Sequence, residues 1–363
     1  MICINKLDSN TLFQNLQEKY FDKCLTLGHY NEPLAENIDY CDKDFIMDLR
    51  KSAECHKMVR CQLQNFIKPG KKIYDICNFI EQSVCTNFGE NSLKQGIGFP
   101  VGYSINNIIA HDTAAPDDTR VLKKDDVVKI DYGTHVNGRI IDSAFTLAYN
   151  QKYKPLLDAT TEATWAAIKM LGPDTYVNDI SEVIDEIISS YQIDLNGKIF
   201  DIKTVGNLGG HNIRPYIIHG GTLILGKKSN NEIIKTMRLK EGECYALETF
   251  ASTGTGEYES LNENNNLFSL KKNHNRVPFK LDITGKVYNH IKNTYDTLPF
   301  CSRWLNDKFG SKYKVAVNEL EKNNIINTYP PLVDIPNSYS SQLEHTVFIH
   351  DYGKEVVSCG DDY

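Results

Sequence analysis

Apolar residues recur at helical spacing through the first half of the chain. In residues 48–66 they fall roughly on one face, and Pro69-Gly70 ends the pattern. An apolar stripe with this period is typical of an amphipathic helix that packs on a core. The same pattern predicts three further helices, over about residues 72–88, 153–171 and 176–191.

Strand patterns lie between and after these helices. Residues 127–132 and 140–147 are rich in apolar side chains, and Asn137-Gly138 separates them. Because both turn residues tolerate a positive φ, this arrangement predicts a hairpin in which Val136 faces Arg139. Residues 244–250 and 342–349 predict two more strands, both buried.

A helical pattern separates those last two strands, over residues 282–328. Because strand signals resume after it, we predict an α+β fold whose core is interrupted by a helical insertion. Residues 1–45 are polar and irregular, and we predict that they form an N-terminal arm. The main domain would then comprise residues 46–363. A glycine-rich stretch, residues 206–221, is predicted to be a loop that carries two histidines.

The composition argues against several classes of protein. With 40 basic and 47 acidic residues among 363, the formal charge is −7, and the sequence pI is about 5.8. No global positive field is available to hold nucleic acid or an anionic membrane. We find no signal sequence at the start and no run of the ~20 apolar residues that a membrane span needs. We therefore expect a cytoplasmic protein.

The ten cysteines do not form a recognisable framework. No two of them are spaced as C-x-x-C, which disfavours zinc ribbons and thioredoxin-like redox motifs. Several fall within segments of helical pattern. We expect free thiols.

Two acidic residues interrupt the apolar strands of the predicted hairpin. Counting back from the turn places Asp131 opposite Ala144 and Asp142 opposite Gly133. Both aspartates then point to the same face as diagonal neighbours, ~7–8 Å apart at the backbone. Two carboxylates in a β-rich core are costly unless they are protonated or neutralised by a cation. A pair of metal ions would neutralise them.

Two glutamates repeat this anomaly. Glu248 and Glu344 lie in the other two predicted strands, and glutamates are rarely buried without a partner. His211 lies in the glycine-rich stretch, where the backbone can approach closely. Four carboxylates and one imidazole suit Mn²⁺, Fe²⁺ or Co²⁺ and, less distinctively, Zn²⁺, and they disfavour thiophilic metals.

Plainer explanations exist for each of these residues. Most acids in strands lie on a solvated face, and a single histidine is usually structural. Buried acids can also pair with buried bases, but only Lys129 and Arg139 lie near the hairpin acids, and Lys129 shares their face. One such contact does not account for four acids together with His111, His211 and His219, so we rank this explanation last.

Several ordered segments closely resemble type 2 methionine aminopeptidases. The likeness runs from about residue 45 to the end, in residues 99–107 with His111, 129–135, 138–142, 210–211, 246–250, 344–346 and 354–363. It implies the pita-bread fold, in which two related α/β halves enclose the active site. The helical region at about 282–328 resembles the insertion that distinguishes type 2 from type 1 enzymes.

The resemblance implies a site of two divalent metal ions. Their ligands would be Asp131, Asp142, His211, Glu248 and Glu344. Of these, Asp142 and Glu344 would bridge both ions.

The resemblance also implies residues that contact substrate. His111 and His219 would hold the scissile carbonyl and the developing oxyanion, and His111 is the position that fumagillin-type epoxides alkylate. Phe99, Ile218 and Tyr329 match the methionine pocket or its rim.

The sequence departs from the family at three positions near this pocket. Leu267 aligns near a histidine of the pocket wall, Pro299 replaces an alanine of the insertion, and Gly209 replaces an asparagine. We expect these changes to affect inhibitor preference and tolerance of the second substrate residue. The long basic N-terminal extension of many type 2 enzymes is absent, which weakens the case for independent ribosome binding.

The expected function is removal of the initiator methionine from nascent proteins with a small second residue. A metal-bridging hydroxide would attack the first peptide carbonyl, and Glu248 would shuttle the proton to the leaving amine. The expected partners are nascent N-termini and, transiently, the ribosome, and we expect a monomer. Two alternatives share the fold: a prolidase or Xaa-Pro aminopeptidase with the same five ligands, and a non-catalytic binding protein that has lost ligands.

Overall fold

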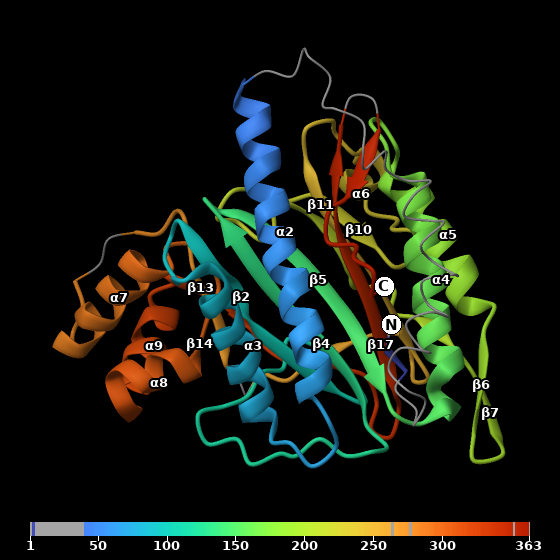
Figure 1. Ribbon diagram of the computed structural model, residues 1–363, viewed down its shortest axis with the longest axis horizontal. Coiled ribbons are helices and arrows are strands. Elements are labelled where there is room, and N and C mark those ends of the chain that lie inside the picture. The colour runs from blue at the N-terminus through green and yellow to red at the C-terminus, as the bar shows by residue number, and fades with distance from the viewer. Residues whose placement is uncertain (1, 4–39, 263–264, 276–277, 351–352, 363) are drawn as a thin grey trace.

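The computed structural model describes residues 2–3, 40–262, 265–275, 278–350 and 353–362. Two twisted sheets lie side by side, and each carries a pair of helices on its outer face (Figure 1). A third group of helices projects from one side, far from α4 and α5 (Figure 1). No helix within the described ranges is long and apolar enough to cross a bilayer.

The first sheet has the strand order β1-β5-β4-β2. It is formed by β1 (Ile2–Cys3), β2 (Gln95–Ile105), β4 (Val127–Val136) and β5 (Arg139–Ala148). Helices α2 (Tyr40–Phe66) and α3 (Ile73–Phe88) pack on it. The prediction of these helices and of the hairpin is confirmed, although α2 begins at Tyr40, within the stretch predicted to be an irregular arm. The remainder of that predicted arm, apart from β1, lies outside the described residues.

The second sheet has the order β10-β9-β11-β17-β18, and β8 also pairs with β11. Its strands are β8 (Lys203–Thr204), β9 (Gly209–Ile213), β10 (Leu223–Leu225), β11 (Cys244–Ser252), β17 (Ser340–Ile349) and β18 (Lys354–Val356). Helix α4 (Lys154–Met170) covers β11 and β17, and α5 (Val177–Ser189) packs beside it. These two helices and the two long buried strands confirm the sequence prediction.

Threonine hydroxyls join the two sheets where β5 passes β17. The hydroxyl of Thr346 accepts a hydrogen bond from the backbone N–H of Asp142 at 2.8 Å and donates to its carbonyl at 2.6 Å. Thr146 does the same for Gln342, at 2.8 and 2.7 Å. Each central strand is thus fixed by a side chain of the other sheet, and the two strands lie close together although no ladder pairs them.

The predicted insertion is a small α/β unit with its own core. It contains α7 (Asp282–Thr294), α8 (Ser302–Phe309) and α9 (Tyr313–Lys322) beside a sheet of β13 (Leu267–Leu270), β14 (Phe300–Cys301) and β15 (Ile326–Tyr329). Residues 300–301 and 326–329 are strands, so the prediction of helix over residues 282–328 was wrong at both places. Strand β15 pairs with β13 from Leu267↔Tyr329 to Leu270↔Ile326, a long-range contact that a local pattern does not reveal.

A buried ion pair docks the insertion on the first half. Arg303 of α8 forms two hydrogen bonds of 2.8 Å with the carboxylate of Glu81 in α3. Trp304 donates to the same carboxylate at 2.8 Å, and the backbone N–H of Val101 in β2 lies 3.3 Å from it. This contact links the insertion to the strand that carries Phe99.

The remaining elements connect these three units. They are α6 (Glu232–Thr236), the hairpin β6 (Gln192–Leu195) with β7 (Lys198–Asp201), the 3-10 turns Gln151–Tyr153 and Gly310–Lys312, and a small sheet of β12 (Glu259–Ser260), β16 (Leu332–Val333) and β3 (Ile108–Ala110). Among the described residues, six cysteines are free thiols, whereas Cys359 is disulfide-bonded, so the prediction of free thiols was wrong at Cys359.

Candidate metal centre and substrate pocket

The hairpin has the predicted register. Asn137 and Gly138 form the turn with φ values of 48° and 76°. Asp131 pairs with Ala144, and Asp142 pairs with Gly133. Both aspartates therefore point to one face of the first sheet, as the count from the turn predicted.

Two strands of the second sheet place two glutamates opposite each other. Glu248 of β11 pairs directly with Glu344 of β17, and His211 of β9 pairs with Ala246 of β11. His211 thus lies on a strand, and the prediction of a loop was wrong. The glycines do allow close approach, because a Cβ on Gly210 would lie 2.4 Å from the carbonyl oxygen of Ala246.

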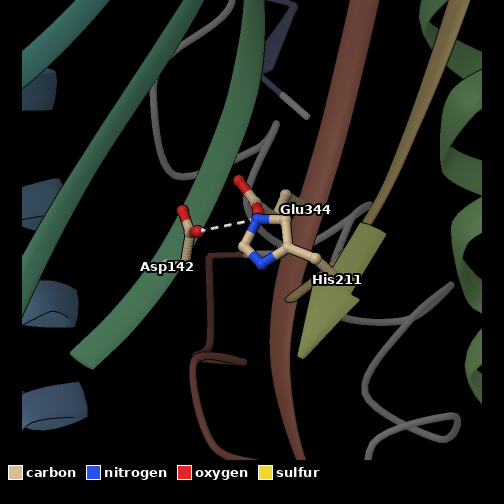
Figure 2. Close-up of side chains that lie close together, drawn as sticks. All are labelled: Asp142, His211 and Glu344. Carbon is tan, nitrogen blue, oxygen red and sulfur yellow. Dashed lines mark ion pairs between the residues drawn. The ribbon is translucent and has the colours of Figure 1, made fainter. Parts of the chain in front are cut away.

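Three of these side chains converge on one point. Ligand-type atoms of Asp142, His211 and Glu344 all lie within 4.8 Å of one another. Figure 2 shows the three side chains pointing together from β5, β9 and β17, with His211 Nε2 at 3.6 Å from Asp142 Oδ2. The same nitrogen lies 3.9 Å from Glu248 Oε1. Asp131 lines the same cavity.

Asp142, Glu248 and Glu344 are buried and Asp131 is partly buried, without a matching positive charge. Burial raises the pKa of Asp131 to about 7. Burial, followed by repulsion from neighbouring carboxylates, raises the pKa values of Asp142, Glu248 and Glu344 well above the ordinary range. Within the described residues, Asp131 Oδ1 and Glu344 Oε2 are buried and have no hydrogen-bond partner. Oxygen atoms left in this state fit a divalent cation.

Buried bases do not balance these acids. The amino group of Lys129 donates to the backbone carbonyl of Asn106 at 2.8 Å, and the Arg139 guanidinium donates to the carbonyl of Asn137 at 2.9 Å. In the described parts of the chain, no lysine or arginine forms an ion pair with any of the four acids. The explanation by buried acid–base pairs therefore fails for this site.

The cavity above the carboxylates is mainly apolar and has an empty volume of about 660 Å³. The predicted pocket residues Phe99, Ile218 and Tyr329 all line it. Leu267 and Pro299, two of the departures from the family, line it as well. The third departure, Gly209, does not, and a Cβ there would lie 2.2 Å from the carbonyl oxygen of Ile224.

Two histidines complete the cavity. The ring centroids of His219 and His211 lie 4.4 Å apart, and Tyr329 lies 5.8 Å from His111 and 5.9 Å from His219. Burial lowers the pKa of His111 to about 4, aided by the nearby His219. The loss of solvent on the cavity side of its ring also lowers the pKa of His219 to about 4, although that residue is partly exposed. Both imidazoles are therefore neutral near pH 7. His111 also has a positive φ of 66°, an uncommon conformation that is concentrated at functional sites.

The sequence reasoning missed one polar residue of the centre. Gln342 Nε2 donates to Glu248 Oε2 at 3.1 Å. Gln342 precedes Glu344 by two positions in β17 and so shares its face. The alternation of the strand could have identified it.

The sequence pattern of metallopeptidase family M24 matches residues 48–273. The chain belongs to metallopeptidase family M24. It is 43% identical over 327 residues to methionine aminopeptidase 2 of Schizosaccharomyces pombe, covering 90% of this chain and 75% of the relative. It is 42% identical over 362 residues to methionine aminopeptidase 2 of Clavispora lusitaniae, covering 96% and 82%.

Solved structures of several other proteins share the fold. A thermophilic Arx1 aligns with a TM-score of 0.74 at 18% identity over 86% of this chain and 90% of that chain. A methionine aminopeptidase of Thermotoga maritima aligns with a TM-score of 0.56 at 18% identity, over 87% of this chain and 97% of that chain. A prolidase of Pyrococcus horikoshii aligns with a TM-score of 0.51 at 13% identity, over 87% of this chain and 62% of that chain. The predicted pita-bread fold is confirmed.

Proposed function

We propose that this M24 peptidase removes the initiator methionine from nascent proteins whose second residue is small. The observation that carries the proposal is the convergence of four carboxylates and one histidine, from both sheets, at the base of an apolar cavity. The relatives above 40% identity, which span most of the chain, support methionine as the residue released.

Divalent metal ions belong to the chemistry of this family, and the donor set fits them. The residues that would hold these ions are Asp131, Asp142, His211, Glu248 and Glu344. When bound, such ions would activate a water molecule as the nucleophile near neutral pH. Oxygen-rich sites with one imidazole favour Mn²⁺, Fe²⁺ or Co²⁺, and Zn²⁺ is less distinctive here.

The walls of the cavity would select and orient the substrate. Phe99 and Ile218 present apolar surface to an unbranched, polarisable methionine side chain, and Tyr329 forms part of the rim. The neutral imidazoles of His111 and His219 can each offer one N–H group to the scissile carbonyl as it becomes an oxyanion. On this assignment His111 is also the nucleophile that fumagillin-type epoxides would modify.

Glu248 is our candidate for proton transfer. Its carboxylate lies beside His211 and receives a hydrogen bond from Gln342, which holds one oxygen in place. From this position the carboxylate would accept a proton from the nucleophile and deliver it to the leaving amine.

Two other functions occur on the same fold. A prolidase or Xaa-Pro aminopeptidase would use the same ligands, but the more similar relatives are methionine aminopeptidases. A non-catalytic binding protein is disfavoured because all five candidate ligands face one buried cavity. We further propose that residues 46–363 form one catalytic domain, that the enzyme acts as a monomer in the cytoplasm, and that it meets its substrates in transient contact with the ribosome.

The first experiment is hydrolysis of Met-Ala-Ser by the purified chain after chelation and addition of Mn²⁺ or Co²⁺. We expect metal-dependent release of methionine, none from Xaa-Pro peptides, and none from the Asp142→Ala variant. Release from Xaa-Pro peptides instead would favour the prolidase function. A folded protein that is inactive with every divalent ion would favour the binding protein.

A further inference from the structure

A buried polar cluster lies around the neighbours of the candidate ligands. It joins helix α2 to the segment 357–362 and comprises His56, Arg60, His345, Ser358 and Asp362, each at most 4% exposed. None of these residues lines the substrate cavity. The buried ion pair and hydrogen bonds of this cluster therefore do not serve substrate contact directly.

Asp362 and Arg60 form the base of this cluster. Arg60 Nε and Nη2 each donate to one carboxylate oxygen of Asp362 at 2.7 Å. Arg60 Nη1 donates to the backbone carbonyl of Ser358 at 2.9 Å and lies 3.2 Å from His56 Nδ1. The two-fold contact fixes the guanidinium plane, which a single hydrogen bond would not do.

One branch of the cluster leads to Asp142 and Glu344. The hydroxyl of Ser358 accepts from the backbone N–H of Thr346 at 3.0 Å, and it lies 3.0 Å from Nδ1 of His345, the residue after Glu344. The hydroxyl of Thr346 in turn holds both the N–H and the carbonyl of Asp142. Four short steps therefore connect Asp362 to the backbone of a candidate ligand.

A second branch leads to Asp131. The ring of His56 stacks on the ring of Tyr132, the next residue after Asp131, at 3.9 Å between centroids and 5° between planes. His56 Nε2 lies 2.9 Å from the carbonyl oxygen of Tyr132, and the Tyr132 hydroxyl donates to the carbonyl of His56 at 2.8 Å. The residues next to two ligands thus belong to one network.

We infer that Asp362, acting through Arg60, is a positioning residue for the metal centre. Alternate residues of a strand face opposite sides, so fixing Tyr132 and His345 fixes the direction in which Asp131 and Glu344 point. Partners outside the ligand shell typically change metal affinity by about 10–100-fold. The inference rests on the proposed ligand set, because it assigns a role relative to those residues.

The test is titration of the metal-free protein with Co²⁺, followed by its visible absorption spectrum. Asp362→Asn breaks the ion pair, and Ser358→Ala removes the hydroxyl while leaving the ion pair intact. We expect about 10–100-fold weaker Co²⁺ binding in both variants. The Co²⁺ spectrum should also change, which a loss of global stability alone would not produce.

Glu355→Gln is the matched control. Glu355 of β18 forms a two-fold ion pair with Arg50, which also lies in helix α2, at 2.8 and 2.7 Å. Neither of these two hydrogen bonds involves a neighbour of a candidate ligand. We expect Glu355→Gln to bind Co²⁺ as the wild type does. The inference is overturned if Ser358→Ala and Asp362→Asn keep wild-type affinity and spectrum, or if the control loses as much affinity as they do. Failure of the wild type itself to bind Co²⁺ would instead refute the proposed ligand set.

Discussion

Glu248 and Glu344 lie directly opposite each other on neighbouring antiparallel strands, and both side chains are buried. Like charges at such a pair are destabilising even on a surface. In the interior, the arrangement is tolerable only if the carboxyls are protonated or share a cation. We therefore expect the folded state of this protein to be sensitive to metal ions.

Removal of metal should lower the thermal stability. An ion that binds only the folded state, at 100 times its Kd, stabilises that state by roughly 2.7 kcal/mol per site. We expect a higher melting temperature with Mn²⁺ than with chelator, measured by calorimetry. Glu344→Gln should abolish most of this difference. An equal melting temperature with and without saturating Mn²⁺ would argue against a cation site here.

Glu248→Gln should lower kcat more than it lowers metal content. The amide keeps one oxygen in place but cannot carry a proton between nucleophile and leaving group, and loss of such catalysis costs roughly 10²–10⁴ in rate. The measurements are Met-Ala-Ser turnover and metal stoichiometry on the same sample. Near-normal turnover with two ions bound would show that the proton takes another route.

Gly133→Ala should narrow the methionine pocket. A Cβ at Gly133 would lie 2.3 Å from the ring of Phe99, so the ring must move. We expect KM for Met-Ala-Ser to rise several-fold with a smaller change in kcat, since the ligands stay in place. Gly172→Ala is the control, because its Cβ would meet only Thr175 Oγ1, at 3.7 Å. Unchanged kinetics of Gly133→Ala would show that Phe99 does not shape the pocket.

Breaking the ion pair between Arg303 and Glu81 should destabilise the protein strongly. The side chains are 1% and 8% exposed, and removal of one partner of a buried pair costs roughly 3–5 kcal/mol. We expect Arg303→Met and Glu81→Leu each to lower the free energy of unfolding in urea. The double variant should lose less free energy of unfolding than the sum of the two single losses.

Glu182→Gln provides the comparison for that pair. Its partner is Lys228, and both side chains are at least half exposed. We expect Glu182→Gln to change the free energy of unfolding by less than about 1 kcal/mol, as for other ion pairs on a surface. If this variant cost as much as Arg303→Met, burial would not be the reason for the large effect.

Glu355 should make the protein sensitive to acid. Burial raises the pKa of its carboxyl, but hydrogen bonds from His350 and Arg50 outweigh burial and bring it to about 2. A carboxyl with a pKa near 4.3 in the unfolded chain then stabilises the fold above that pH, and this stabilisation is lost as pH falls towards 2. Melting temperatures of wild type and Glu355→Gln should differ at pH 6 and converge near pH 2. If the difference between the two melting temperatures grew as the pH fell, the lowered pKa of Glu355 would be contradicted.

The sequence predicted the hairpin of the site well because its information is local. Asn137-Gly138 specifies the turn, and once the turn is fixed the alternation of the strands places Asp131 and Asp142 on one face. The strands that carry Glu248 and Glu344 were also predicted, and acids within apolar strands single these residues out as candidates.

What depended on distant pairing was predicted less well. His211 was assigned to a loop because the glycines around it resemble turn residues, whereas pairing with β11 makes the segment a strand. Residues 326–329 follow α9 and the turn at Asn323-Asn324, and their pairing with the distant strand β13 makes them a strand. The cluster around Arg60 and Asp362 joins residues 302 positions apart, which no local pattern predicts.

Thr346 holds the backbone of Asp142, and Thr146 holds the backbone of Gln342. These contacts determine when, during synthesis of the chain, the candidate metal centre can form. Asp142 is made early, but the hydroxyl that holds its backbone lies 204 positions later in the chain. During synthesis the N-terminal part of a chain is made and folds first. The candidate metal centre, however, takes residues from both sheets. The first half alone therefore carries Asp131 and Asp142 without the threonine that holds Asp142. The enzyme becomes able to process other nascent chains only after most of its own chain has been made.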